Sequence, residues 1–158
     1  MDKQVIIQEL KNSQEYFNRS TRNLAEEHST FAPSEGLMTA SQQVAHVAQT
    51  VEWFVEGAFS PAGFRMDWEE MMKPITATVS LAAARAWLDR AFAAAIATAE
   101  AKTQEEWNAP MPPNPIFGEA PRWTILGGIM DHTAHHRGAL TVYARLKGVT
   151  PPMPYMET

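Results

Sequence analysis

The sequence Asp131-His132-Thr133-Ala134-His135-His136-Arg137-Gly138 lies within a segment that we predict to be a long helix. The helix is expected to begin near Pro121, since proline suits the first turn of a helix, and to end at Lys147-Gly148. Residues four apart in a helix lie on the same face, one turn above each other. The octet therefore places the imidazoles of His132 and His136 side by side, close enough to share one metal ion.

Three further helices are predicted upstream, at about residues 3–28, 39–57 and 80–107. Each combines apolar residues at helical spacing with polar residues between them. The connection 60–78 contains glycine and proline, with a short helical turn expected inside it, and the connection 109–115 is rich in proline. No segment is typical of a strand. The sequence thus predicts an all-α fold, a four-helix bundle with long connections.

Two of these helices carry recognisable start signals. Thr39 and Gln42 have the spacing of a capping box, in which each side chain accepts a hydrogen bond from the backbone of the other residue. Ser80 is a favourable N-cap for the alanine-rich third helix. With no internal repeat and no composition shift, we expect a single domain over residues 1–158.

The composition excludes several classes of function. The chain has 158 residues, 45% hydrophobic and 20% charged, with a formal net charge of -5 and scattered basic residues, which disfavours nucleic-acid binding. It has no cysteine, which excludes disulfides, thiolate ligands and a cysteine nucleophile. The N-terminus lacks the pattern of a signal peptide, and no apolar run approaches the roughly 20 residues of a membrane span. We therefore expect a cytoplasmic protein that does not bind membranes.

A third candidate ligand, His46, lies on the second predicted helix in the apolar run Val44-Ala45-His46-Val47-Ala48. Taken alone, such a histidine is more simply a core residue hydrogen-bonded to a carbonyl or carboxylate. Taken with His132 and His136, it predicts a divalent-metal site, because helical bundles build such sites from facing helices.

Three imidazoles without a fourth protein ligand describe an open metal site. Structural zinc normally has four protein ligands, whereas catalytic zinc keeps one position for water or substrate. The glutamate of an H-E-x-x-H protease motif is absent, because Thr133 stands in its place, so that class of protease is excluded. Imidazole suits several ions. Zinc is expected on availability, with nickel, iron or manganese as alternatives.

Four further residues have roles that the sequence allows us to predict, two of them with an alternative. His135 lies about 100° around the helix from His136 and is expected to pack or form an interface, or else to contact substrate. Arg137 is expected to pair with a carboxylate or to reach a substrate anion. Gly138 is costly in a helix and is expected to serve close packing, including across a dimer interface. His28, at the end of the first predicted helix, is expected to be a favourable charge when protonated.

The octet and the lone helical histidine at position 46 resemble the DinB/YfiT-like family of metal-dependent enzymes. In that family a four-helix bundle with a long connection binds a divalent ion through one histidine of the second helix and two of the last. The resemblance implies the metal-ligand role for His46, His132 and His136, and it implies a homodimer. The chain departs from the family pattern at Asp131, where asparagine is common, and at Ala139, where glutamine or asparagine is usual. Neither position is a ligand.

Some relatives in this family activate a low-molecular-weight thiol (bacillithiol, mycothiol or glutathione) at the metal, and one branch isomerises maleylpyruvate with such a thiol. The resemblance therefore implies a metal-dependent transferase acting on a small-molecule substrate. The lack of cysteine is compatible with this chemistry, because the thiol would come from the cosubstrate. A metal-dependent hydrolase is an alternative, with Glu52, Glu56 and Asp131 as the nearest acids or bases in sequence.

A third alternative is a non-catalytic, stress-related metal-binding dimer. Four aromatic residues would line either a partner interface or a substrate pocket. They are Trp53 of the predicted second helix and, in the connection that follows it, Phe59, Phe64 and Trp68. A cleft that reaches the metal would favour an enzyme, whereas a sealed metal would favour the non-catalytic protein.

Overall fold

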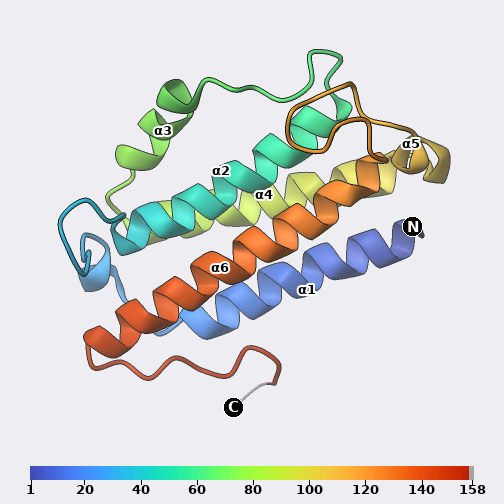
Figure 1. Ribbon diagram of the computed structural model, residues 1–158. Coiled ribbons are helices and arrows are strands. Elements are labelled where there is room, and N and C mark those ends of the chain that lie inside the picture. Colours follow the sequence, from blue (N-terminus) through green and yellow to red (C-terminus); the bar gives the residue numbers. More distant parts are fainter. Residues whose placement is uncertain (157–158) are drawn as a thin grey trace.

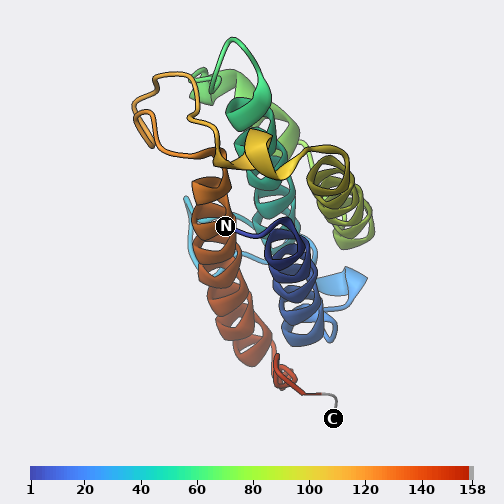
Figure 2. The ribbon, with the colours of Figure 1, turned by 90° about the vertical axis from the view of Figure 1, so that its right-hand side faces the viewer.

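Four long helices form the body of the molecule (Figure 1). The structure is a computed structural model that describes residues 1–156, among which no β-strand occurs. The long helices are α1 (Lys3–Thr21), α2 (Ala40–Phe59), α4 (Leu81–Ala101) and α6 (Ile125–Leu146). α2 packs against α4 and α6, and α1 packs against the same two helices. Figure 2 shows the bundle from the end at which α1 begins, with α1 and α6 next to each other. The predicted all-α four-helix bundle is confirmed; the single domain over residues 1–158 stays a prediction.

The core lies where the four long helices meet. Its largest fully buried side chains include Trp107, Phe17 and Phe92. Apolar residues of α2 and α6 complete it, with Val44 and Leu140 each at 0% exposure. Among residues 1–156, no helix is both long enough and apolar enough to cross a membrane.

One connection determines the topology of the bundle. α2 and α4 run in the same direction, so the chain returns along the bundle between them, outside α2 (Figure 1). This return holds α3 (Trp68–Thr76), which packs on α2. The helical turn expected in this connection is therefore confirmed. α3 continues through Pro74, which the sequence assigned to a loop; Pro74 is exposed and near the end of the helix, so its missing N–H is tolerated there.

The structure confirms the N-caps predicted for the second and third helices. Thr39 Oγ1 accepts from the Gln42 N–H at 3.3 Å, and Gln42 Oε1 accepts from the Thr39 N–H at 2.9 Å. Ser80 Oγ accepts from the Ala83 N–H at 3.2 Å and begins α4. These contacts satisfy backbone donors that have no partner within the first turn of a helix.

The first predicted helix ends earlier than expected, at Thr21 instead of residue 28. Arg85 of α4 explains the early end, because its guanidinium donates to the Thr21 carbonyl oxygen at 2.6 Å and to Thr21 Oγ1 at 3.1 Å. His28 lies beyond, in a separate 3₁₀ turn (Glu26–His28), where it is buried and its Nδ1 accepts from the Ala25 N–H at 3.0 Å. The expected role of His28 as a charge at the end of the helix is wrong.

Two other predicted boundaries also shift. The third predicted helix is interrupted at Lys102, whose backbone is extended, and α5 (Gln104–Asn108) follows as a separate helix. Thr103 and Glu106 form a capping box that starts α5, a local signal which the sequence contains. Pro121 precedes a 3₁₀ turn (Arg122–Thr124), and α6 begins only after it.

Three glycines of α6 differ in what surrounds them. A Cβ at position 128 would lie 2.7 Å from Cζ of Phe54, so only glycine leaves room for that ring. A Cβ at position 127 or 138 would meet nothing within 4 Å. Gly138 is exposed, so the expected close packing of this glycine is wrong within the chain itself. Its role across a dimer interface stays a prediction.

The neighbouring glycines 127 and 128 should respond oppositely to alanine. Gly127→Ala should raise the free energy of unfolding by up to about 1 kcal/mol, because alanine is the better helix former. Gly128→Ala should lower it by about 1–3 kcal/mol, because the new methyl group displaces the Phe54 ring. Urea unfolding of the metal-free protein measures both values, and equal changes in the two variants would contradict the packing described above.

Candidate metal centre

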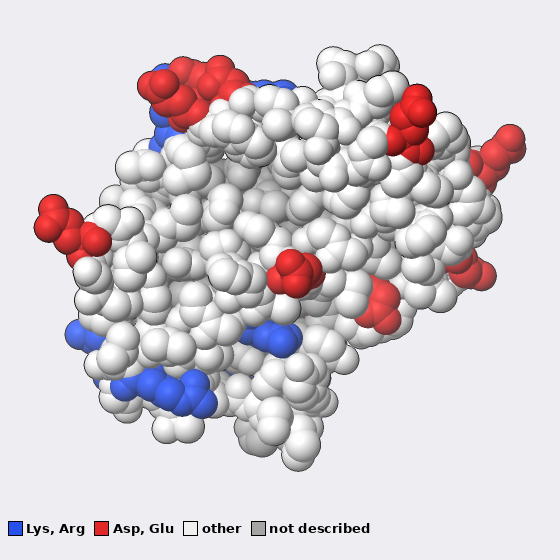
Figure 3. Space-filling model, viewed as in Figure 1, with Lys and Arg blue, Asp and Glu red and all other residues white. Residues whose placement is uncertain are grey.

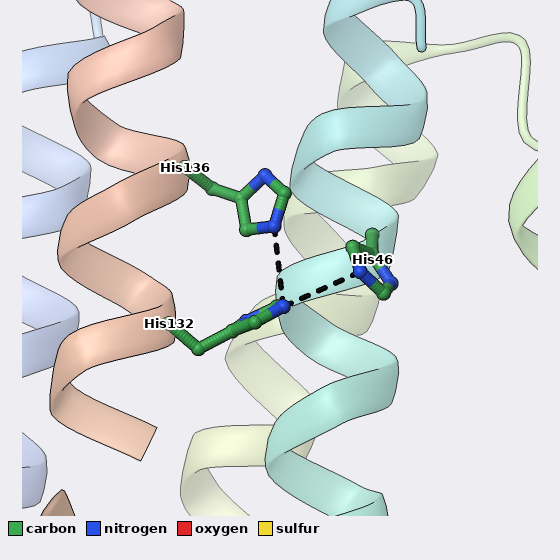
Figure 4. A group of neighbouring side chains, drawn as sticks. All are labelled: His46, His132 and His136. Atoms are coloured by element: carbon green, nitrogen blue, oxygen red, sulfur yellow. Dashed lines mark hydrogen bonds between the residues drawn. The ribbon is translucent and has the colours of Figure 1, made fainter. Parts of the chain in front are cut away.

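Three imidazoles meet between α2 and α6 (Figure 4). His46 comes from α2, and His132 and His136 come from successive turns of α6. Nε2 of His132 lies 3.3 Å from Nε2 of His46 and 3.2 Å from Nε2 of His136. One nitrogen from each of the three rings lies within 4.8 Å of the others. The structure therefore brings together all three histidines that the sequence singled out.

The arrangement suits a common metal ion. Zinc–imidazole bonds of about 2.0–2.1 Å at tetrahedral angles imply nitrogen–nitrogen separations of about 3.3 Å. Hydrogen bonding alone explains the cluster less well, because a neutral ring nitrogen carries at most one hydrogen and His132 Nε2 faces two other nitrogens. The residues present could thus hold a divalent cation.

Burial keeps these imidazoles neutral. Burial is the main cause that lowers the pKa of His132 to about 4 and the pKa of His136 to about 3, and the neighbouring imidazoles contribute a smaller part of the same shifts. Burial also lowers the pKa of His46, and His135 adds to this effect. A metal ion requires the free lone pair of a neutral imidazole. At neutral pH the three side chains therefore offer lone pairs without first losing protons.

A chain of hydrogen bonds determines which nitrogen of His136 is free. The carbonyl oxygen of Met38 can only accept, and the Tyr143 hydroxyl donates to it at 2.9 Å. With its hydrogen used, Tyr143 Oη accepts from Nε2 of Gln43 at 3.3 Å. This orients the amide so that Gln43 Oε1 accepts from the Nδ1–H of His136. The proton on Nδ1 leaves the Nε2 lone pair of His136 pointing toward the other histidines.

Sequence reasoning did not single out Gln43 or Tyr143. The signals were present in the spacing: Gln43 lies three residues before His46, and Tyr143 lies seven residues after His136, so each shares a helix face with a candidate ligand. Within residues 1–156, Nδ1 of His46 and Nδ1 of His132 are buried without a hydrogen-bond partner. His136 is therefore the candidate ligand whose tautomer the protein itself sets.

His46 and His132 also form part of the wall of a cleft of about 250 Å³. Besides these two histidines, the cleft is lined by polar and apolar side chains of α2 and by side chains of α3, namely Gln49, Thr50, Trp53, Phe54, Trp68, Met71 and Met72. Of the four aromatic residues considered from the sequence, Trp53 and Trp68 thus line the cleft. Phe64 packs behind Trp53, and Phe59 packs on Trp107.

The acidic residues considered as acids or bases do not line this cleft. Glu52 is exposed and accepts a hydrogen bond from Nε1 of Trp87 at 3.0 Å, and Glu56 and Asp131 are exposed as well. A larger hollow, of about 420 Å³, lies along α1, away from the histidines, and is lined by solvated polar residues. The apolar cleft is therefore the one that belongs to the histidine cluster.

His135 and Arg137, the two residues next to His136 in the sequence, have different surroundings. His135 is exposed, with its ring centroid 4.9 Å from that of His136. Arg137 contacts Tyr155, donating to its hydroxyl at 3.4 Å with the guanidinium 5.7 Å from the ring centroid. Within residues 1–156 no ion pair joins Arg137 to a carboxylate, so the expected pairing is wrong.

A comparison with protein-family models shows to which family this chain belongs. The model of the DinB family matches residues 1–158. The chain belongs to the DinB family. None of the curated proteins matches the sequence.

Two solved structures of DinB-like proteins share this fold. YjoA, a DinB-like protein from Bacillus subtilis, superposes with a TM-score of 0.69 at 18% identity, covering 98% of this chain and 99% of that chain. YfiT from Bacillus subtilis superposes with a TM-score of 0.70 at 18% identity, covering 94% of this chain and 89% of that chain. YfiT is described as "a probable metal-dependent hydrolase with an unusual four-helix bundle topology". At these identities the likeness establishes the fold.

Removing the hydrogen bond to His136 should weaken metal binding. Gln43→Leu removes the acceptor for the Nδ1–H and should raise the Kd for zinc about 10–100-fold, the usual effect of losing such a partner. Tyr143→Phe should have a smaller effect, because it only frees the amide of Gln43 to rotate. Competition with a chromophoric chelator measures the Kd. Gln8→Leu, at an exposed glutamine of α1 away from the histidines, is the control, and an unchanged Kd in Gln43→Leu would contradict the role of this chain of hydrogen bonds.

The metal-free protein should lose stability as the pH falls below about 6.5. The unfolded chain takes up protons at its histidines near pH 6.5, whereas His132 and His136 in the folded chain do so only near pH 4 and pH 3. Between pH 6.5 and these lower values the unfolded state binds more protons than the folded state, so the free energy of unfolding decreases as the pH is lowered. Urea unfolding at about pH 7 and about pH 5 measures this fall. The double variant His132→Gln/His136→Gln should show a smaller fall, and an equal fall would count against buried neutral imidazoles.

Proposed function

We propose that this DinB-family protein is a divalent-metal-dependent transferase that activates a low-molecular-weight thiol. His46, His132 and His136 are the metal ligands in this proposal. The observation that carries it is the convergence of three neutral imidazoles beside an apolar cleft. An open three-histidine site of this kind leaves a coordination position for a small molecule.

The residues of the chain have distinct roles in this proposal. A divalent ion bound there supplies Lewis acidity, which lowers the pKa of a bound thiol toward neutrality. The neutral imidazoles would hold the ion without changing its charge, and Gln43, by accepting from the Nδ1–H of His136, leaves Nε2 of that ring free to bind it. Trp53 and Met71 give the space beside His46 and His132 an apolar lining, and charge interactions are stronger where apolar side chains take the place of water.

Metal-dependent hydrolysis is the second candidate function. It is favoured by YfiT, which has the same fold and is described as "a probable metal-dependent hydrolase". Hydrolysis commonly uses a protein acid or base near the metal. Glu52, Glu56 and Asp131 do not line the cleft, so such a group is absent from its described lining. Thiol activation needs no protein acid or base at that place, and for this reason it is the leading proposal.

Several finer expectations belong to the same proposal. Zinc is proposed as the metal on availability, and nickel, iron and manganese are the alternatives. A homodimer is proposed from the resemblance to the family, and a cytoplasmic location from the N-terminal sequence. The cleft beside the histidines favours an enzyme over the non-catalytic, stress-related metal-binding dimer.

The metal-binding part of the proposal is tested by metal content. The wild-type protein, purified without a nickel column, should carry about one equivalent of a divalent metal, the number that one site with an open position holds. His46→Ala and His132→Ala should each abolish it, because two imidazoles hold an ion poorly. His135→Ala is the control and should keep the metal. A wild-type protein that cannot be loaded would make the three histidines structural and would remove the basis for metal chemistry.

The thiol part is tested on the cobalt-substituted protein. Titration with 2-mercaptoethanol should change the visible absorption spectrum, because a thiolate that joins three imidazoles alters the ligand field. The spectrum of the cobalt protein without thiol is the reference. Loading with cobalt but no response to any small thiol would reject thiol activation while leaving metal binding intact.

A further inference from the structure

The cleft beside His46 and His132 has a wall of aromatic rings that pack on one another. The ring of Trp53 lies 5.0 Å from that of Phe54, 4.9 Å from that of Phe64 and 5.5 Å from that of Trp68. Nε1 of Trp53 donates to the carbonyl oxygen of Arg65 at 2.7 Å. Because its only donor is used in this way, Trp53 offers the cleft ring surface alone.

Two helical glycines make room for this wall. A Cβ at position 57 of α2 would overlap the ring of Phe64, and a Cβ at position 128 of α6 would lie 2.7 Å from Cζ of Phe54. Glycine inside a helix costs roughly 0.5–1 kcal/mol relative to alanine. The chain thus gives up helix stability at the two positions where the rings occupy the space of a side chain. The aromatic rings are therefore packed tightly into the fold, because glycine at these two positions makes room for them.

The described lining of the cleft contains no Asp, Glu, Lys or Arg. Its polar side chains are the two histidines with Gln49 and Thr50, and Thr50 Oγ1 lies 3.5 Å from Nε2 of His132. Figure 3 shows the corresponding face of the molecule, on which most charged side chains lie toward the edges and a hollow lies above the centre. A charged group moved into such a place without a partner loses its hydration at a large cost in free energy.

The volume of the cleft limits what can enter. An engineered apolar cavity of about 150 Å³ in another protein holds one benzene molecule. The cleft of about 250 Å³ is larger by about two-thirds, which corresponds to one ring with a short substituent.

From the aromatic wall, the absence of charge and the volume, we infer that the substrate part bound in this cleft is an uncharged, flat apolar group. It is an aromatic or conjugated group of about one substituted ring, and its reacting polar end lies against His46 and His132. Charged portions of a thiol or electrophile stay outside the cleft. This inference rests on the proposed function in taking the histidine cluster as the centre of the reaction.

The test compares two nitroaromatic molecules that differ in charge. The zinc-loaded full-length protein is titrated with 4-nitrobenzyl alcohol, which is neutral, and with 4-nitrobenzenesulfonate, an anion that binds metals weakly. Nitroaromatic rings quench tryptophan emission on contact, and Trp53 and Trp68 line the cleft. We expect saturable quenching with a Kd at least about 10-fold lower for the alcohol, since the sulfonate would lose hydration without gaining a partner. Equal affinities, or tighter binding of the sulfonate, would overturn the inference.

A variant with an added charge places the binding in this cleft. Met72→Lys introduces an ammonium group on α3 at a residue that lines the cleft and should reduce or reverse the preference for the neutral ring. Val79→Lys is the matched control, because Val79 is 65% exposed on the same connection and does not line the cleft. A preference that Met72→Lys leaves unchanged would show that the quenching ring binds elsewhere.

This experiment is independent of the cobalt experiment with thiols. Selective binding of the neutral ring together with a cobalt spectrum that ignores thiols would keep the substrate class and reject thiol activation. A response to thiols together with equal binding of the two nitroaromatics would keep thiol activation and reject the substrate class.

Discussion

The contact between α2 and α6 is the interaction on which the other features depend. These antiparallel neighbours bury Val44 and Leu140 in the core and direct His46 toward His132 and His136. Separated from one another, buried imidazoles would leave polar nitrogens without partners, which is costly in an apolar interior. Placed face to face, their lone pairs converge on one point. The same contact between the two helices therefore packs the core and brings the three candidate ligands together.

The topology of the chain and the shape of the cleft have a common cause. Because α2 and α4 run in the same direction, the connection between them travels the length of the bundle and carries α3 along the outside of α2. Trp68, Met71 and Met72 of α3 complete the wall that Trp53 and Phe54 begin. A bundle with short turns throughout would have no segment at this place. The long return of the chain thus creates the apolar space beside the histidines.

A chain of hydrogen bonds links a backbone carbonyl to the histidine cluster. The carbonyl of Met38 has no hydrogen to give, and this property determines the orientation of Tyr143, of the Gln43 amide and of the His136 ring in turn. The lone pair at Nε2 of His136 is therefore set by a carbonyl group three hydrogen bonds away. Burial adds the second condition, because it keeps the imidazoles uncharged.

Local signals in the sequence were sufficient for much of the fold and for the three histidines. Periodicity predicts the four long helices, and two of them begin where the hydroxyls of Thr39 and Ser80 accept hydrogen bonds from backbone N–H groups of the first turn. The spacing of His132 and His136 placed them on one face, because rise and rotation per residue are constant in a helix. The break before α5 also has a local signal, the capping box of Thr103 and Glu106, although periodicity alone predicts one continuous helix over 80–107.

The tertiary structure alone decided which residues from distant parts of the chain meet. Arg85 of α4 ends α1 at Thr21, Gln43 of α2 orients His136, and Arg137 finds Tyr155 in place of a carboxylate. Such pairings depend on how helices are rotated and placed against one another, and this is set by the packing of the whole core. The sequence by itself determined which side chains share a helix face; the packing of the bundle determined which of those faces meet.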